Sequence, residues 1–288
     1  MKRLIVNADD FGYTRGVNAG IIRGFRHGII TSTTIMANGA AFEDAICRAG
    51  ENPTLGVGCH LVLVGGVCVE APRAIPSLAG SDGQLPPSLA MLTSKLLARV
   101  VRAEDIAREL RAQVSKLMRA GIRPTHLDSH KHTHSHPQVM EQVARVAEEF
   151  GIHRVRKPFE DRDVSVRFMW GDGWGSLRQS VTALVARRAA PRFEKLAKAH
   201  GICTPEHFWG VAATGHLNQE MVLSMIGSMP DGANELMCHP GEYDQELELS
   251  HTRLKREREK ELEALMDPAV RLAIEERGIE LVDYRGLN

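Results

Sequence analysis

The chain has 288 residues, and its 36 lysine and arginine side chains balance 36 aspartate and glutamate side chains, so its formal net charge is zero. Without a sequence-wide positive field, it is not expected to recruit nucleic acid or an anionic membrane. Its apolar runs fall short of the about 18 residues that a membrane span needs, and we expect no signal-peptide core. Five scattered cysteines, none of them in a CxxC pair, predict reduced thiols and a cytoplasmic protein.

Short apolar runs alternate with amphipathic segments along the chain. The apolar runs predict strands at Arg3–Asn7, Ile30–Met36, Gly56–Leu63, Thr125–Asp128, His153–Arg156, His207–Ala212, Glu235–Cys238 and Ile279–Asp283. The amphipathic segments predict helices at Val17–His27, Ala103–Ala120, Gln138–Phe150, Leu177–His200, Glu220–Ser228 and Arg253–Arg277. This alternation is typical of a parallel sheet with right-handed crossovers. We therefore expect an α/β fold, an irregular (β/α) barrel of seven or eight mainly parallel strands, in one domain spanning residues 1–288.

Two segments interrupt the alternation. Gly65–Pro87 is rich in glycine and proline and predicts a long loop, and Lys157–Gly175 is too irregular for either regular element. Long loops on a rigid scaffold are where ligand contacts usually lie. The charge run Arg253–Glu263 indicates the solvated face of a helix.

Four of the predicted strands end in aspartate or histidine. The side chains at these strand ends are Asp9 with Asp10, His60, Asp128 with His130, and His239. In parallel α/β folds the carboxyl ends of the strands share one face, which holds the active site. We therefore expect these side chains to converge although the sequence separates them widely.

Imidazoles and carboxylates in one cluster are suitable ligands for a divalent ion such as zinc, or for a harder ion if water completes the shell. Such an ion polarises a carbonyl and lowers the pKa of bound water to about 7. Of the adjacent carboxylates Asp9 and Asp10, one can bind the ion while the other takes a proton from the attacking water.

Each of these residues also has a simpler interpretation. The Asp9-Asp10 pair can be a turn with solvated carboxylates, His60 a core histidine, and His239 the start of a turn. The alternating histidines at 132, 134 and 136 share a face of an extended segment but cannot all reach one ion. The joint pattern at four strand ends is what favours a site.

The sequence resembles the YdjC-like carbohydrate deacetylases in six blocks that occur in the family's order. The blocks are IVNADDFGYTRGVNAGI at 5–21, TSTTIMAN at 31–38, VGCHLVLV at 57–64, THLDSHKHTH at 125–134, VRKP at 155–158 and ELMCHPGEYD at 235–244. The first block and the histidine block are the specific ones. The resemblance covers nearly the whole chain and implies a (β/α) barrel with fewer or distorted strands.

The resemblance implies a metal centre and two catalytic residues. Asp10, His60 and His130 would hold one divalent ion, with magnesium or zinc preferred and manganese or nickel as alternatives. Asp9 would be the general base that activates the metal-bound water. His239 would be the general acid that protonates the leaving amine, a role for which His132 and His134 compete.

Three further residues are expected beside this centre. Asp128 and His132 would orient the site or contact the substrate. Arg156 is a candidate for contacting sugar hydroxyls or the oxyanion, with a surface salt bridge as the alternative. Cys59 should point away from the metal face, so we do not expect it to be a nucleophile.

The reaction that the resemblance implies is hydrolysis of the N-acetyl group of an amino sugar, on an oligosaccharide or a glycolipid headgroup. A metal-dependent phosphoesterase and a non-catalytic sugar- or metal-binding protein are the alternatives. The family precedent suggests a homodimer. The Trp170–Trp174 segment can stack on a sugar or pack in a subunit interface.

Overall fold

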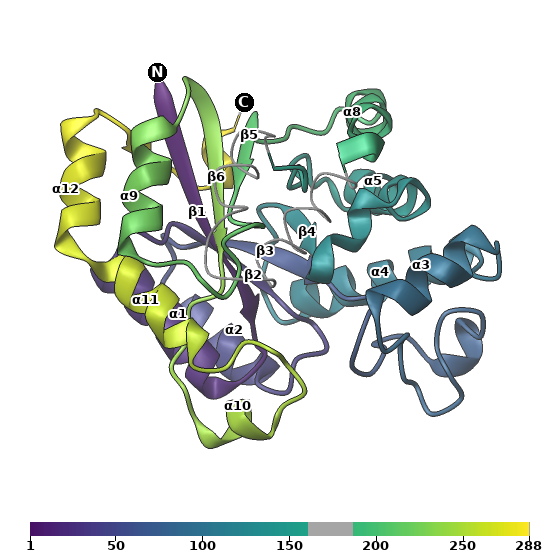
Figure 1. The fold of residues 1–288 in the computed structure, drawn as a ribbon. Coiled ribbons are helices and arrows are strands. Elements are labelled where there is room, and N and C mark those ends of the chain that lie inside the picture. The colour runs from purple at the N-terminus through teal and green to yellow at the C-terminus, as the bar shows by residue number, and fades with distance from the viewer. Residues whose placement is uncertain (161–186, 288) are drawn as a thin grey trace.

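The computed structural model describes residues 1–160 and 187–287, and a single parallel sheet forms its centre (Figure 1). The strands are β1 (Lys2–Phe11), β2 (Ser32–Ile35), β3 (Gly56–Leu61), β4 (Leu127–Ser129), β5 (His207–Trp209), β6 (Gly232–Cys238) and β7 (Glu280–Leu281). Six of them follow the order β4-β3-β2-β1-β6-β5, and β7 pairs with β1 off this path. All of these strand pairs are parallel, as the alternating pattern predicts.

The helices lie on the outside of the sheet (Figure 1). They are α1 (Arg15–His27), α2 (Phe42–Gly50), α3 (Leu89–Leu97), α4 (Ala103–Arg119), α5 (Pro137–Phe150), α8 (Ala190–Ala199), α9 (Gln219–Ser228), α10 (Gln245–Leu249), α11 (Glu257–Met266) and α12 (Pro268–Glu276). Helix α1 packs against α2 and α11, α4 against α5, and α9 against α12. Within the described ranges, no helix is both long and apolar enough to cross a membrane.

The expected closed barrel of seven or eight strands is not confirmed. The continuous path of the sheet in the described residues has six strands, which makes a half-barrel. The strand predicted at His153–Arg156 is reduced to isolated bridges, from Val155 to Leu127 and from Arg154 to Cys203. These single bridges continue the parallel pairing beyond β4 without forming a ladder.

Strand β1 is longer than predicted and carries both aspartates of the candidate site. It pairs with β6 over seven residues, from Lys2 opposite Gly232 to Ala8 opposite Cys238. Its register against β2 then shifts between Ala8 and Phe11. The sequence predicts that the strand ends at Asn7, because the apolar run ends there. The backbone pairing instead continues through the register shift to Phe11.

The single helix predicted at Arg253–Arg277 is two helices, α11 and α12. The break falls at Asp267 and Pro268, because proline lacks the backbone N–H that would continue α11. The Asp267 carboxylate accepts a hydrogen bond from the backbone N–H of Ala269 and so caps α12. Of the helix predicted at Leu177–His200, residues 177–186 lie outside the described ranges, and α8 forms the rest.

The loop predicted at Gly65–Pro87 is present, with a short 3-10 turn at Pro72–Ala74 and an antiparallel bridge between Val67 and Gln84. Buried Glu109 of α4 anchors it by accepting hydrogen bonds from the backbone N–H groups of Val69 and Glu70. All five cysteines are free, as expected. The Trp170–Trp174 segment lies outside the described residues.

Candidate metal centre

Asp10, His60 and His130 come together at the carboxyl ends of β1, β3 and β4, on one face of the sheet. Asp10 lies near the end of β1, His60 lies in β3, and His130 begins the 3-10 segment that follows β4. Asp10 Oδ1 is 3.5 Å from His60 Nε2 and 3.2 Å from His130 Nδ1. One donor atom from each side chain lies within 4.8 Å of the others, a spacing that a metal ion can bridge. Asp10 and His60 are buried, and His130 is partly exposed.

Three residues at this centre have a backbone conformation that residues other than glycine rarely adopt. Asp10 has φ of 68°, and Lys131 and His132, immediately after His130, have φ of 54° and 52°. Left-handed conformations at residues other than glycine cost about 1–3 kcal/mol each and persist where the surrounding structure imposes them. They let β1 turn Asp10 towards the histidines, and they form the sharp turn between His130 and the following residues.

Asp128 and Thr34 fix the ring of His60. Asp128 Oδ1 lies 2.8 Å from His60 Nδ1, and the Thr34 hydroxyl donates to Asp128 Oδ2 at 3.0 Å. The other ring nitrogen, Nε2, is thereby directed towards Asp10. A carboxylate behind a ligating histidine is a common arrangement in metal sites. Burial acts to lower the pKa of His60, but Asp128 and the two neighbouring aspartates raise it to about 9.

Arg258 of α11 neutralises the second oxygen of Asp10. Its Nη2 lies 2.6 Å from Asp10 Oδ2, and only 1% of Arg258 is exposed. Burial acts to raise the pKa of Asp10, but Arg258 and His130 hold it well below its ordinary range. Because Arg258 occupies Oδ2, Oδ1 is the oxygen left to face the histidines.

The charge run Arg253–Glu263 was therefore predicted wrongly as a solvated face, because Arg258 and Glu261 in it are buried. Leu262 and Leu265 follow Arg258 at helical spacing and are buried too. That spacing is the sequence signal that marks Arg258 as a core position.

Arg156 is buried against three carboxylates. Its Nη1 and Nη2 donate to the two oxygens of Asp9, both at 2.7 Å, its Nε donates to Glu235 at 2.7 Å, and Nη1 lies 2.8 Å from Asp128 Oδ2. The surface salt bridge considered for Arg156 is wrong, because the side chain is 0% exposed. Every guanidinium nitrogen already has a carboxylate partner, so Arg156 holds Asp9 and Asp128 in place.

Asp9 is an ionised carboxylate beside the three candidate ligands. Burial acts to raise its pKa, but the charge and hydrogen bonds of Arg156 hold that pKa well below the ordinary range. The Asn7 side-chain amide also donates to Asp9 Oδ1 at 3.0 Å. Asp9, His60 and Asp128 form a second group with metal-ligand spacing. Its carboxylates are already bound to Arg156, whose positive charge disfavours a cation there.

His239 follows β6 and brings a fourth strand end to the site. Its backbone N–H donates to Glu261 Oε2 at 2.6 Å, and Glu261 also accepts from the backbone N–H of Gly215. The ring atom Nδ1 is buried and has no hydrogen-bond partner among the described residues. Burial lowers the pKa of His239 to about 4, against the opposing charges of Asp10 and Asp9.

The other histidines of the block at 125–134 have separate environments. His134 is buried, with Nδ1 2.5 Å from the Ser129 hydroxyl and Nε2 3.1 Å from the carbonyl oxygen of Arg156. His132 packs edge-on against Phe208, and its buried Nδ1 has no hydrogen-bond partner within the described ranges. Burial and the charge of Arg156 hold the pKa of His132 well below its ordinary value. Cys59 is buried, and burial raises the pKa of its thiol, so it is not a nucleophile.

The residues present fit a divalent ion. Asp10 Oδ1 is a buried oxygen without a hydrogen-bond donor among the described groups, facing two ring nitrogens. Two imidazoles and one carboxylate form the donor set of many catalytic zinc sites, which leave a position open for water or substrate. The set is compatible with magnesium, manganese or nickel when water completes the shell.

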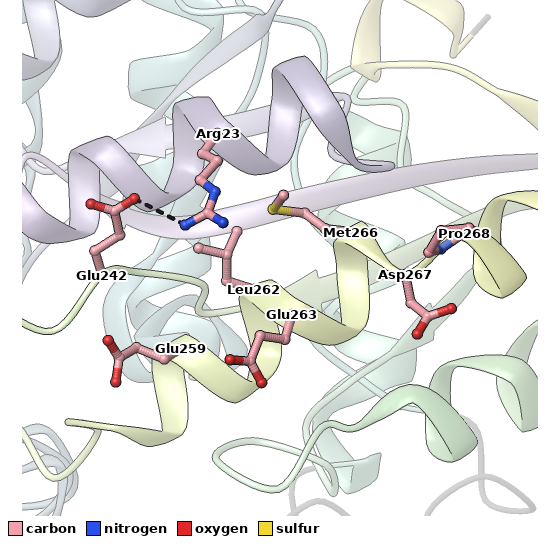
Figure 2. A pocket seen from close by; sticks show the side chains of 8 residues that line it. All are labelled: Arg23, Glu242, Glu259, Leu262, Glu263, Met266, Asp267 and Pro268. Carbon is pink, nitrogen blue, oxygen red and sulfur yellow. Dashed lines mark ion pairs between the residues drawn. The ribbon is translucent and has the colours of Figure 1, made fainter.

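A separate hollow lies between α1 and α11 and does not include these residues. Figure 2 shows Arg23 of α1 directed towards Glu242, 3.5 Å away, with Glu259, Glu263 and Asp267 nearby. Leu262, Met266 and Pro268 complete its lining. Its lining is largely acidic and contains no histidine. It shares no residue with the group formed by Asp10, His60 and His130.

The comparison with known proteins decides the family. The family described as YdjC-like protein matches residues 3–276. The chain belongs to the YdjC-like family. A protein named carbohydrate deacetylase from Geobacillus stearothermophilus is 34% identical over 282 residues, which cover 98% of this chain and 96% of that protein. A carbohydrate deacetylase from Brevibacillus brevis is also 34% identical, and the match covers 99% of both proteins.

A solved structure from the same comparison has a similar fold. It is a crystal structure of a candidate cellobiose-phosphate cleavage protein from Enterococcus faecalis, 26% identical, with a TM-score of 0.77. The match covers 99% of this chain and 98% of that chain. The match to the family over residues 3–276 confirms the predicted resemblance to the YdjC-like family.

Proposed function

We propose that this YdjC-like protein is a metal-dependent carbohydrate deacetylase that hydrolyses the N-acetyl group of an amino sugar and releases acetate. The observation that carries the proposal is the cluster of Asp10, His60 and His130 beside Asp9 and His239 at the ends of β1, β3, β4 and β6. The names of the Geobacillus and Brevibacillus relatives support the carbohydrate substrate and the deacetylation.

One divalent ion, held by Asp10, His60 and His130, would polarise the acetyl carbonyl and make a water molecule acidic enough to attack at neutral pH. Asp9 accepts the proton of this water. Arg156 keeps Asp9 ionised and holds its carboxylate in a fixed plane, which positions an oxygen for the proton although the same contact lowers the basicity of that oxygen.

His239 delivers a proton to the nitrogen of the leaving amine. Burial keeps its imidazole neutral before the reaction. The negative charge that develops on the oxygens of the tetrahedral carbon favours the imidazolium form of His239. His239 therefore takes up the proton that Asp9 removed from the water and passes it to the nitrogen as the C–N bond breaks. The neutral amine then leaves, and the acetate product separates from it.

The substrate class is an N-acetylated saccharide, either an oligosaccharide or a glycolipid headgroup. The 65–87 loop follows β3, which carries His60, and is suited to contact the part of the saccharide beyond the acetyl group. His132, with its unpartnered ring nitrogen, is suited to a hydrogen bond with the sugar. Zinc or magnesium is the ion that we expect.

The Asp9→Asn variant tests the role of the base. The amide keeps the size of the carboxylate but cannot take a proton, so turnover should fall at least about a hundredfold. Metal content measured by elemental analysis should stay at the wild-type level, because Asp9 is not among the three ligands. Asp231→Asn is the matched control and should retain full acetate release, because the Asp231 side chain is 78% exposed and precedes β6 at the end opposite to His239.

Retained acetate release in Asp9→Asn would contradict the assignment of the base. Loss of metal together with turnover would instead place Asp9 among the ligands.

A further inference from the structure

A buried chain of polar side chains connects the C-terminal segment, residues 280–287, to the candidate site. The Tyr284 hydroxyl donates to Glu235 Oε2 at 2.5 Å. Glu235 Oε1 accepts from Arg156 Nε at 2.7 Å. Arg156 then binds both oxygens of Asp9 at 2.7 Å and approaches Asp128 at 2.8 Å. We name these five residues the Tyr284 relay.

The relay continues to the metal centre through one more contact. Asp128 Oδ1 is 2.8 Å from Nδ1 of His60, the ring whose Nε2 faces Asp10. The side chains of Arg156, Asp128 and Glu235 are 0% exposed, and that of Asp9 is 3% exposed. Because water does not reach these groups, a missing hydrogen bond cannot be replaced by solvent.

Tyr284 is itself held firmly at the opposite end of the sheet from the site. Both chain ends lie near the amino-terminal end of β1 in Figure 1. The ring of Tyr284 stacks on His126, with ring centres 3.6 Å apart and planes inclined by 6°. Arg3 donates to the carbonyl oxygen of Gly286 at 2.7 Å, and Arg154 donates to that of Leu287 at 3.1 Å. The hydroxyl therefore has a fixed position from which to hold Glu235.

We propose that Tyr284 is a positioning residue of the site, which acts through Glu235 to fix the guanidinium plane of Arg156 and thereby the carboxylates of Asp9 and Asp128. Asp9 faces the reacting water, and Asp128 sets the orientation of a metal ligand. This inference rests on the proposed deacetylase function for Asp9, but its connection to the metal centre does not depend on turnover.

Two variants separate positioning from packing. Tyr284→Phe removes the hydroxyl and leaves the stacked ring. Leu287→Ala is the matched control, because Leu287 packs in the same small cluster with Ile5 and Tyr284 but has no polar contact in its side chain. Both changes should lower the melting temperature, since one leaves a buried carboxylate oxygen without its donor and the other leaves a cavity.

The readouts are the kcat and KM of acetate release, and the dissociation constant of Zn²⁺ measured by calorimetry on metal-free protein. In Tyr284→Phe we expect kcat to fall and Zn²⁺ binding to weaken, each about tenfold, as is usual when a group behind a ligand or base is lost. KM should not change, because Tyr284 does not reach the substrate. Leu287→Ala should retain wild-type kcat and Zn²⁺ affinity at temperatures well below its melting point.

Equal kcat and equal Zn²⁺ affinity in the two variants would overturn the proposal and leave Tyr284 a packing residue. If the wild-type protein releases no acetate from any saccharide, the proposed function fails. The Zn²⁺ titrations of the two variants would then still decide whether the relay acts on the metal centre.

Discussion

The sequence predicts which residues form the candidate site, but it does not predict how their side chains are oriented. Asp10, His60 and His130 stand at predicted strand ends, and parallel strands bring such ends together. The left-handed turn at Lys131 and His132 has little sequence signal, because lysine rarely adopts this conformation, although histidine adopts it more often than most residues. The resemblance to the YdjC-like family, rather than the residue pattern alone, predicts His130 as the ligand among these histidines, and the backbone turn that follows it separates it from the later ones.

His126 gives the stability of the protein a dependence on acid pH. Burial, with a contribution from Arg156, holds its pKa well below the ordinary value in the folded state. The unfolded chain takes up a proton near pH 6.5 that the folded protein does not, so this histidine has no effect on the folding equilibrium well above that pH and favours unfolding as the pH falls below it.

We predict that His126→Phe reduces the loss of unfolding free energy between pH 6.5 and 5.5 by up to about 1.4 kcal/mol, the value of one proton over one pH unit. Urea unfolding at the two pH values measures it. His153→Phe replaces a histidine outside the core and is the control. The same pH dependence in His126→Phe and wild-type protein would contradict the neutral, buried state of His126.

At the scale of elements, α11 shows how a charged segment can belong to the site. Its Arg258 lies among charged residues that indicate a solvated face, and only the apolar side chains of Leu262 and Leu265 at helical spacing point to burial. Long-range partners such as the Arg258–Asp10 pair, 248 residues apart, leave no local pattern. Sequence periodicity indicates which face of a helix is buried. It does not indicate which charged residue forms an ion pair with a buried side chain on that face.

We predict that Arg258→Met destabilises the metal-free protein by about 3–5 kcal/mol, because it leaves the buried Asp10 carboxylate without its cation. Added Zn²⁺ should recover part of this loss, since a divalent ion supplies positive charge to the same carboxylate. Chemical unfolding with and without Zn²⁺ measures both effects. Arg256→Met is the control at the N-cap of the same helix, because the Arg256 side chain is 70% exposed.

Destabilisation of Arg258→Met that is the same with and without Zn²⁺ would mean that Arg258 and the metal do not act on the same group.

At the scale of the whole molecule, β1 organises both the fold and the site. It pairs with β2, β6 and β7, so segments from the two ends of the chain meet on it. The alternation of elements predicts a parallel sheet, and seven of the eight predicted strands are present within or overlapping β1 to β7. The order of the strands and the half-barrel depend on contacts between distant segments, which periodicity does not contain.

The same dependence on distant contacts explains why the sequence does not predict the Tyr284 relay. Glu235 and Tyr284 lie in or near predicted strands, and nothing local distinguishes a buried glutamate from an exposed one. Their role depends on Arg156, which lies in a third segment and forms ion pairs with residues of β1, β4 and β6. The sequence therefore predicts that Asp10, His60, Asp128 and His130 lie together, but it does not predict that Glu235, Tyr284 and Arg258 contact the groups around them.

The most direct test of the account is a metal titration of acetate release. Protein stripped with a chelator is supplied with Zn²⁺ or Mg²⁺, and acetate released from an N-acetylated oligosaccharide is measured at each addition. The account predicts no release from metal-free protein, recovery that is complete at about one equivalent of a tightly bound ion, and no recovery in His130→Ala. Release that persists without metal, or that survives His130→Ala at the wild-type rate, would contradict it.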